Sequence, residues 1–255
     1  MPGNDIIRSL AMGLDVLALM AESENGVRVK DVARKMEIKP PVAHNILRTL
    51  RYKGFAVKYS DSPHYQIGPE LHQLALNQAR ERMFRSVENV MQEIVDRIPD
   101  ATVTFCQPVA GDVMVRRRLS ADRHGVMQRP SGYTLTLYGS ASGLALLAFC
   151  SEECYLSLQQ RHPLLDEASN LWYPPEKLDE YLERVRSQGY ALHPCGDEKR
   201  LAVAAPVRGP GESLTGIIGI CRTAGRNGRF DDSDLEQSVG VLLDSVDQVS
   251  HSHGV

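Results

Sequence analysis

Residues 27–68, VRVKDVARKMEIKPPVAHNILRTLRYKGFAVKYSDSPHYQIG, predict two short amphipathic helices followed directly by a β-hairpin. Apolar residues recur at helical spacing on both sides of Pro40 and Pro41, which suit a tight turn and a first helical position. Gly54 ends the second helix, and strand-like alternation on both sides of residues 60–63 predicts the hairpin. Helices and a hairpin in this order are typical of a winged helix-turn-helix.

Positive charge is concentrated in this stretch. Residues 28–58 contain nine Lys or Arg and two Asp or Glu, a local charge of +7 (9 − 2) in a chain of net charge −3. Residues 1–78 hold ten basic and eight acidic residues (+2), whereas residues 79–255 hold nineteen and twenty-four (−5). A basic segment attached to an acidic one indicates that the first part contacts a polyanion and the second has another task.

The outer face of the second helix, residues 41–52, carries side chains suited to DNA. Asn pairs with adenine, Arg with guanine and Val with the thymine methyl group, while Lys58 and His64 of the hairpin suit a phosphate or a minor groove. The candidate DNA-contacting residues are Arg28, Lys30, Pro41, Val42, His44, Asn45, Arg48, Thr49, Arg51, Lys58 and His64. The alternative is that these elements pack for structure alone, or bind a protein, and that the charges form a solvated face.

Helical patterns also flank this stretch. A first helix shows one apolar face at helical spacing and should end near Asn25 and Gly26; the face is formed by Ile6, Leu10, Leu14, Leu17 and Met20. From Leu71 another helix should run through residues 81–85 and link the two parts of the chain.

The remaining residues alternate between strand and helix patterns, which describes an α+β domain with an antiparallel sheet. Helices are expected at 86–98, 140–149, 151–161, 175–188 and 231–249, and strands at 102–109, 112–118, 201–208 and 215–222. The 255 residues suffice for two ordinary domains.

Three segments of this second part are candidates for ligand chemistry. Small residues over 137–143 leave backbone amides bare at a helix N-terminus, which favours a carboxylate, although close helix packing needs small residues too. The loop with His193 and Cys195 suits a pocket but is weak as a metal site. Arg222 suits either a carboxylate in a pocket or a solvated sheet edge. No catalytic constellation stands out, and we expect no metal and no cofactor.

Composition favours a cytoplasmic protein without a membrane partner. The longest apolar run, residues 144–150, has seven residues, far fewer than the roughly 20 that span a bilayer. No signal-peptide pattern opens the chain. Five cysteines, an odd number, do not form a disulfide framework in a chain of this length and indicate reduced thiols.

With both parts considered, the chain resembles the IclR family of bacterial transcription regulators over nearly its whole length. The resemblance is carried by SLxxGLxVL at 9–17, NILRTL at 45–50, YQIG at 65–68, ASGLALLA at 141–148, GYA at 189–191 and AAPV at 204–207. It implies a winged helix-turn-helix DNA-binding domain over residues 1–70, a linker helix over 71–88 and a GAF-like effector-binding domain over 89–255. It also implies a homodimer, often paired into a tetramer, that binds a double-stranded DNA operator and responds to a small-molecule effector.

The chain departs from the family pattern at positions that matter for specificity. Pro41 and Val42 stand where the family usually has Ser-Thr, and Asn45 where it often has Arg. Family members that bind glyoxylate-like acids hold the ligand with an Asp and a Cys, whose places are taken here by about Leu192 or His193 and by Ala202.

By the same comparison Cys221 replaces a serine, so we expect a pocket more apolar than the glyoxylate type. The resemblance implies the effector-binding residues Gly139, Ser140, Ala141, His193, Ala202 and Cys221. The run 142–150 looks most like activators of aromatic-acid catabolism, which leads to the hypothesis of an aromatic or other mid-sized carboxylate effector.

Two other classes of function stay open. One is an enzyme with Cys195 or Cys221 as nucleophile and His193 as base, although no pair shows nucleophile–base spacing and the basic segment would be unexplained. The other is a thiol-based redox sensor that uses Cys150 and Cys154. Activator and repressor, and dimer and tetramer, are equally compatible with the sequence.

Overall fold

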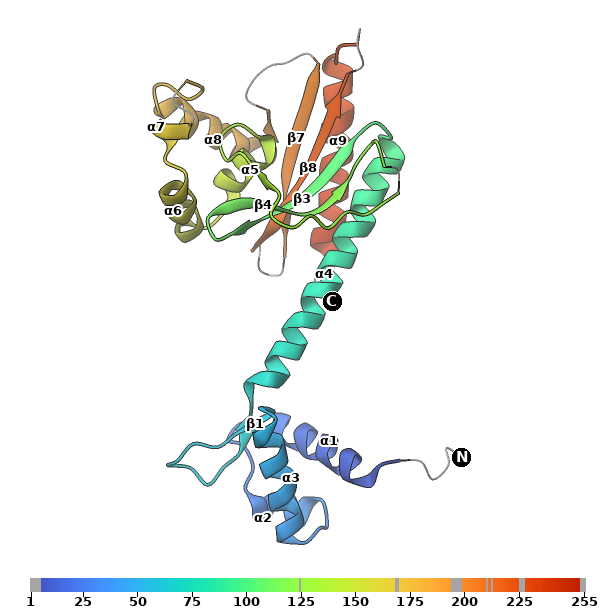
Figure 1. Ribbon diagram of the computed structural model, residues 1–255, viewed down its shortest axis with the longest axis vertical. Helices are drawn as coiled ribbons and strands as arrows, with labels where there is room; N and C mark the ends of the chain where they lie inside the picture. The colour runs from blue at the N-terminus through green and yellow to red at the C-terminus, as the bar shows by residue number, and fades with distance from the viewer. Residues whose placement is uncertain are drawn as a thin grey trace. The chain divides into compact units, whose positions relative to one another are not determined.

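The chain forms two compact units, Met1–Arg82 and Met83–Val255. The structure, a computed structural model, describes residues 6–123, 125–167, 170–193, 199–209, 211, 213–224 and 228–252. Helix α4, Pro69–Arg97, begins in the first unit and ends in the second (Figure 1). Each unit has its own hydrophobic core.

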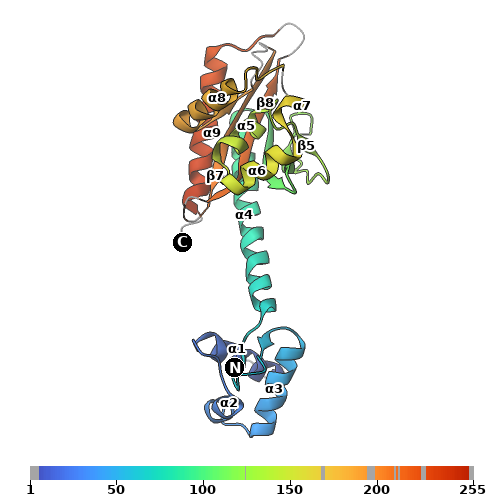
Figure 2. The same ribbon diagram turned by 90° about the vertical axis from the view of Figure 1, so that its left-hand side faces the viewer.

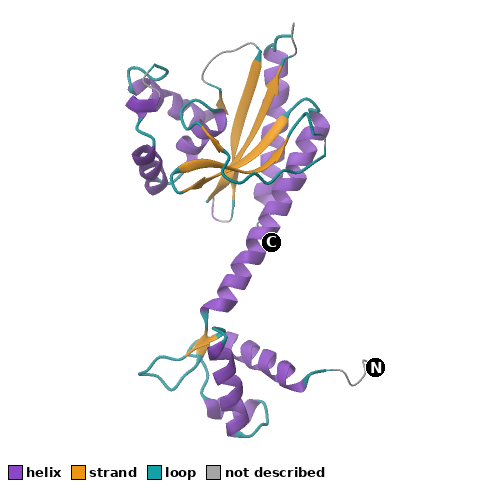
Figure 3. Ribbon diagram, in the orientation of Figure 1, coloured by secondary structure: helices purple, strands orange, loops and turns teal. Residues whose placement is uncertain are grey.

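Unit 1 has the predicted winged helix-turn-helix order. Its elements are α1 (Arg8–Ala21), α2 (Val29–Lys35), α3 (Pro40–Tyr52), β1 (Ala56–Val57) and β2 (Gln66–Ile67). Pro40 is the first residue of α3, where a missing amide donor costs nothing. The hairpin pairs Ala56 with Ile67, and Tyr65 forms an additional bridge to Val27. Figure 3 shows these short strands beside three helices, which confirms the predicted fold of this part.

The sequence predicted one apolar face along the whole of α1, but the residues of its first half are not buried. Val16 and Met20 are buried against α3 and the hairpin, but Leu10 and Leu14 are 59% and 58% exposed. Residues two apart on a helix lie about 200° apart around its axis, so Leu14 faces away from the side on which Val16 is buried. The helix ends at Ala21, four residues earlier than its Asn25-Gly26 stop signal suggested.

Unit 2 is built on a six-stranded antiparallel sheet in the order β5-β4-β3-β8-β7-β6. The strands are β3 (Thr102–Val109), β4 (Asp112–Leu119), β5 (Thr134–Leu135), β6 (Ala191–Leu192), β7 (Arg200–Arg208) and β8 (Leu214–Thr223). The chain therefore returns from β4 through a helical segment and completes the sheet next to β3. This arrangement places residues more than 110 positions apart in sequence on neighbouring strands.

Helices cover both faces of this sheet. The second half of α4 and α9 (Asp232–Ser252) lie on one face, and the other carries α5 (Ala141–Phe149), α6 (Glu152–Arg161), α7 (Leu164–Glu167) and α8 (Glu176–Gln188) (Figures 1 and 2). Strand β8 serves both layers because its side chains alternate: Ile218 and Ile220 pack toward α4 and α9, and Ile217 packs toward α5. Among the residues that the structure describes, no helix is long and apolar enough to cross a bilayer.

The long helices and strands of unit 2 agree with the sequence prediction, whereas its shortest helix and strands were not predicted. The helical segments expected at 71–85 and 86–98 form the single 29-residue helix α4. The predicted strands and the later helices differ from the observed ones by at most three residues at either end. Strands β5 and β6 and helix α7 have only two to four residues, too few for a periodic pattern, and were not predicted.

A bulge in β4 sends Val115 and Arg117, which would share a face in a regular strand, to opposite faces of the sheet. Phe105 pairs with Arg117 and Cys106 with Val115, so one β4 residue has no partner on β3. Val115 packs toward α5, whereas Arg117 points toward α4. The Arg117 side chain is only 10% exposed; its Nε donates to Glu88 Oε1 at 2.5 Å, and its guanidinium carbon lies 3.9 Å from the Phe84 ring centroid.

We predict that Glu88→Gln lowers the free energy of unfolding of unit 2 by roughly 1–3 kcal/mol, because it leaves a nearly buried guanidinium without its counter-charge. Arg129, whose Nη2 lies 3.2 Å from Glu88 Oε1, loses the same partner. Trp172 is buried in unit 2 and donates to the Tyr138 carbonyl at 3.0 Å, so its fluorescence during denaturation in guanidinium chloride reports the change. Glu93→Gln, an exposed position on the same helix, should have no effect; equal stabilities for both variants would contradict the prediction.

Candidate DNA-binding face and effector cavity

Helix α3 has one buried and one exposed face. Ala43 and Leu47 are fully buried in the core of unit 1, with Ile46 and Leu50 packed against it. The predicted contact residues of this helix are all exposed: Val42, His44, Asn45, Arg48, Thr49 and Arg51. The Thr49 hydroxyl donates to the Asn45 carbonyl at 2.8 Å, so toward a partner it offers only its acceptor lone pairs. A helix with such a face has the size and chemistry to enter a DNA major groove.

The predicted contact residues before α3 and in its first turn differ in how they are held. Lys30 and Pro41 are exposed, as a contact residue must be. Arg28, in contrast, donates from Nε to Asp31 Oδ2 at 3.0 Å, and this hydrogen bond lowers the pKa of Asp31 below its usual value. Its charge is therefore partly compensated, which makes Arg28 a weaker candidate than Lys30 for a phosphate contact.

The hairpin side chains have local partners as well. The Lys58 ammonium lies 5.2 Å from the Tyr65 ring centroid, close enough for a cation–π contact. His64 Nδ1 lies 3.3 Å from the Ser62 hydroxyl. Lys58 remains exposed, so the ring orients the charge without removing it from solvent.

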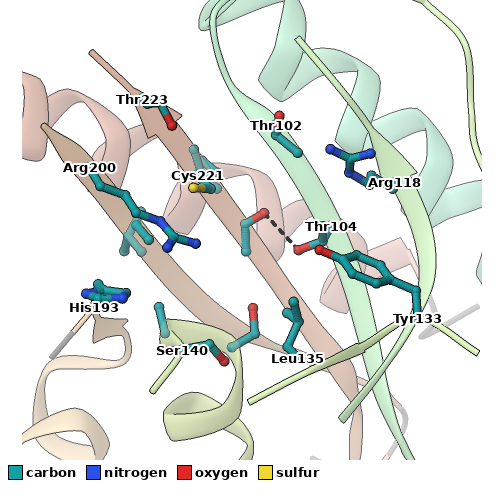
Figure 4. Close-up of a pocket in the computed structure, with 16 residues that line it drawn as sticks. Thr102, Thr104, Arg118, Tyr133, Leu135, Ser140, His193, Arg200, Cys221 and Thr223 are labelled. Atoms are coloured by element: carbon teal, nitrogen blue, oxygen red, sulfur yellow. Dashed lines mark hydrogen bonds between the residues drawn. The ribbon is translucent and has the colours of Figure 1, made fainter. Parts of the chain in front are cut away.

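Unit 2 contains a cavity of about 260 Å³ on the α5 side of the sheet (Figure 4). It is lined by Thr102, Thr104, Arg118, Tyr133, Leu135, Ser140, Ala141, Ser142, His193, Arg200, Ala202, Val203, Gly219, Ile220, Cys221 and Thr223. Five of the six residues proposed for the effector thus line one cavity, although they come from four separate segments. The sixth, Gly139, precedes Ser140 and does not line it.

The small residues before α5 were interpreted either as a carboxylate site or as a requirement of close helix packing. The structure gives each interpretation a basis, but for different residues. A Cβ on Gly143 would lie 2.2 Å from the Leu137 carbonyl oxygen, so close packing alone requires glycine there. Ser140 caps the helix: its hydroxyl accepts from the Gly143 amide at 3.0 Å and donates to the Thr136 carbonyl at 2.6 Å. Ser140, Ala141 and Ser142 line the cavity, so the N-terminus of α5 contributes to its wall.

The lining of the cavity is partly charged and polar; that it is more apolar than the glyoxylate type stays a prediction. The lining contains the guanidinium groups of Arg118 and Arg200 together with several hydroxyl groups. Figure 4 shows both arginine side chains directed into the space between them. The alternation of β7 offered a signal for Arg200, since it lies two residues before Ala202 and shares its face. The sequence offered no signal for Arg118, because no sequence pattern marks the β4 bulge that orients its side chain.

Arg222 does not belong to this cavity. Its Nε donates to Asp100 Oδ2 at 2.9 Å, its Nη1 lies 3.4 Å from Asp234 Oδ1, and its guanidinium carbon lies 4.9 Å from the Phe230 ring centroid. These partners lie on the α9 side of the sheet, opposite to its neighbour Cys221. Arg222 thus binds carboxylates of the protein itself, which excludes both the ligand-binding and the solvated-edge interpretation.

The cysteines give little support to thiol chemistry. Burial, followed by the nearby Cys154, raises the pKa of Cys150 to about 12, whereas a redox-sensing thiol needs a low pKa. Cys221 and His193 line the same cavity, and Cys195 lies outside the described residues. Within the described part of the chain, no group of three His, Cys, Asp or Glu side chains is placed to hold a metal ion.

The two units match two parts of one known family. Residues 78–251 match the bacterial transcriptional regulator IclR C-terminal domain, and residues 9–59 match the IclR helix-turn-helix domain. The chain belongs to the IclR family. Its members are ligand-responsive transcription regulators whose helix-turn-helix domains bind DNA and whose C-terminal domains bind small molecules.

Curated relatives and a solved structure agree with this assignment. The chain is 24% identical over 196 residues to the transcriptional repressor IclR of Escherichia coli, covering 75% of this chain and 70% of that protein. It is 27% identical over 255 residues to the HTH-type transcriptional regulator BhcR of Paracoccus denitrificans, covering 96% and 86%. The crystal structure of Thermotoga maritima IclR has the same fold, with a TM-score of 0.56 at 20% identity over 98% of this chain and 100% of that one. As an IclR-family chain, this protein is a transcription regulator, and the enzyme and redox-sensor alternatives are not favoured.

We predict that Cys150 is alkylated by iodoacetamide at pH 8 at least about 100-fold more slowly than free cysteine, because a thiol of pKa about 12 is almost entirely protonated there. The rate should rise about tenfold per pH unit above 8, which peptide mass spectrometry after timed quenching can measure. The same protein in denaturant provides the control, in which Cys150 reacts like the free amino acid. A native rate close to the denatured one would restore the redox hypothesis.

Proposed function

We propose that this regulator acts as a homodimer that binds a palindromic operator through α3 and the β1–β2 hairpin, and that it controls catabolic genes in response to a small carboxylate in the cavity of unit 2. The carboxylate is aromatic or of similar size. In this proposal residues 1–70 are the DNA-binding domain, 71–88 the linker helix and 89–255 the effector-binding domain. The observation that carries it is the exposed polar face of α3, flanked by cationic side chains.

The DNA contacts follow from the exposed faces of unit 1. Asn45 and Arg48 sit on the outer face of α3 and have the side chains that read adenine and guanine edges. Lys30, Arg51 and Lys58 are exposed around them and suit phosphate contacts. Two such units on a dimer would present their α3 helices to successive major grooves, about 34 Å apart.

The exposed leucines of unit 1 support a homodimer. Leu10 and Leu14 lie one helical turn apart on α1 and are more than half exposed, as are Leu74 and Leu76 on α4. A small DNA-binding unit rarely keeps an apolar helix stripe in water, because burying it gains about 25 cal/mol per Å². An isologous contact with a second copy covers the stripe on both partners and gives the pairing that a palindrome requires.

Strand β4 supports a route from the cavity to the linker helix. Arg118 lines the cavity, and its neighbour Arg117 is paired with Glu88 of α4 on the other face of the sheet. A ligand that binds Arg118 better in one arrangement of β4 than in another also favours one position of Glu88. This differential affinity is the only means by which an effector shifts the linker helix and, through it, operator affinity.

We predict that Arg48→Ala weakens binding to a double-stranded fragment from around the protein's own locus by roughly 1–3 kcal/mol and relaxes base choice at one position. Lys58→Ala should reduce the slope of affinity against salt concentration with little effect on base choice. Electrophoretic mobility shifts over a salt series measure both effects. Lys35→Ala is the matched control, because Lys35 Nζ is 3.5 Å from Glu22 Oε2 and lies outside the proposed contacts. Unchanged binding in both test variants would refute the contact assignment.

We predict that Leu14→Asp raises the dimer dissociation constant at least about tenfold, since it places a charge in the centre of the proposed contact. Sedimentation velocity over a concentration series measures the change. Leu156→Asp on α6 is a closely matched control, because Leu14 and Leu156 are equally exposed at 58%. If both variants associate like the wild type, α1 does not form the dimer contact.

A further inference from the structure

The effector cavity has a guanidinium group at each of two sides. Arg118 comes from β4 and Arg200 from β7, and strands β3 and β8 lie between them in the sheet. Three interstrand spacings separate β4 from β7, which is about 14 Å at the backbone. Figure 4 shows the two side chains entering the cavity from opposite sides, so that their charges face the same space.

The described lining contains no Asp or Glu that would neutralise these two charges from within the cavity. Other polar groups of the lining can donate to an anion, among them the hydroxyl groups of Thr102, Tyr133 and Thr223. A ligand with one carboxylate has the charge to satisfy one guanidinium group and leaves the other to water. A ligand with two carboxylates satisfies both.

Arg118 is held in place without being neutralised. Its Nη1 donates to the amide oxygen of Gln128 at 3.3 Å, and the backbones of the two residues form hydrogen bonds of 3.0 and 2.8 Å. The nearest acid in sequence, Asp122, has its pKa lowered mainly by a hydrogen bond from Ser120 and only in smaller part by Arg118. Gln128 therefore acts as a positioning residue: it orients the guanidinium and leaves its charge for a ligand.

We propose that the effector is a dicarboxylate whose carboxylates are separated by several carbon atoms, one bound by Arg200 and the other by Arg118. The proposal rests on the proposed function, which places a carboxylate effector in this cavity, and it narrows the class of effector to dianions. A cavity of about 260 Å³ limits the ligand to a small molecule such as a six-carbon diacid or a benzene ring with two carboxylates. Acids whose two carboxylates are adjacent cannot reach both guanidinium groups.

Calorimetric titration of the full chain with matched pairs of acids tests this proposal. Adipate is compared with hexanoate and terephthalate with 4-methylbenzoate, so that each pair differs in one carboxylate at nearly constant size. We expect at least one diacid to bind at least about tenfold more tightly than its monoacid, as one added charge-assisted pair requires. The advantage should shrink as salt rises, because Arg200 is solvent-exposed.

Substitutions identify the side chains that are responsible for the preference for a diacid. Arg118→Gln and Arg200→Gln should each abolish most of the preference for the diacid. Gln128→Glu keeps the shape of the side chain but gives Arg118 a carboxylate partner, and should lower diacid affinity by a similar factor. Arg116→Gln removes the same charge from β4 at a position outside the lining and should leave the preference intact. Trp172 fluorescence during denaturation verifies that each variant is folded.

The outcomes separate this inference from the function on which it rests. If monoacids bind as tightly as diacids, or if the arginine variants weaken both alike, the dicarboxylate inference is wrong and a carboxylate effector in this cavity stands. If none of the four acids binds, the carboxylate effector of the proposed function is also wrong, while operator binding, measured separately, is unaffected.

Discussion

The bulge in β4 is the constraint on which the second unit depends. In a regular strand Val115 and Arg117 would share a face, and either an arginine would enter the core beneath α5 or a valine would leave it. The additional residue opposite Phe105 and Cys106 resolves this conflict, because after it the side chains of β4 alternate in the opposite phase. Val115 then fills the core under α5, Arg117 reaches Glu88 on α4, and Arg118 reaches the cavity.

The Arg117–Glu88 pair is better understood as a device for orientation than as a source of stability. A buried ion pair loses much of its attraction to desolvation, and an apolar pair of similar volume is often as stable. An apolar pair lacks direction, whereas Arg117 donates to one carboxylate oxygen and its guanidinium carbon lies 3.9 Å from the Phe84 ring centroid. These directional contacts favour one rotation of α4 about its axis against β4. Since the same carboxylate also receives Arg129, the helix is held by two segments of the chain that precede α5.

The sequence predicted unit 1 well because its structure is local. Helical periodicity, Pro40 at the first turn of α3 and Gly54 after it determine the three helices, and the exposed side of α3 follows from its buried side. The same reasoning failed where a helix is apolar on two sides, since periodicity cannot say whether Val16 or Leu14 of α1 faces the core. In unit 2 the long strands and helices were predicted. Arg118 and Arg200, however, line one cavity only because β3 pairs with β8, between residues more than 110 positions apart, and no local pattern encodes such a register.

Residue chemistry pointed to Ser140, Ala141 and His193, and family resemblance added Ala202 and Cys221. The cavity brings these five residues together without explaining their chemistry. None of the five carries a permanent charge, so together they would favour a ligand only weakly over water. The permanent charges come from the two arginines, and one of them, Arg118, follows directly after Arg117, which pairs with Glu88 of α4. A ligand bound to Arg118 would therefore contact the strand whose other face pairs with α4, because the bulge places Arg117 and Arg118 on the helix side and the cavity side of the sheet.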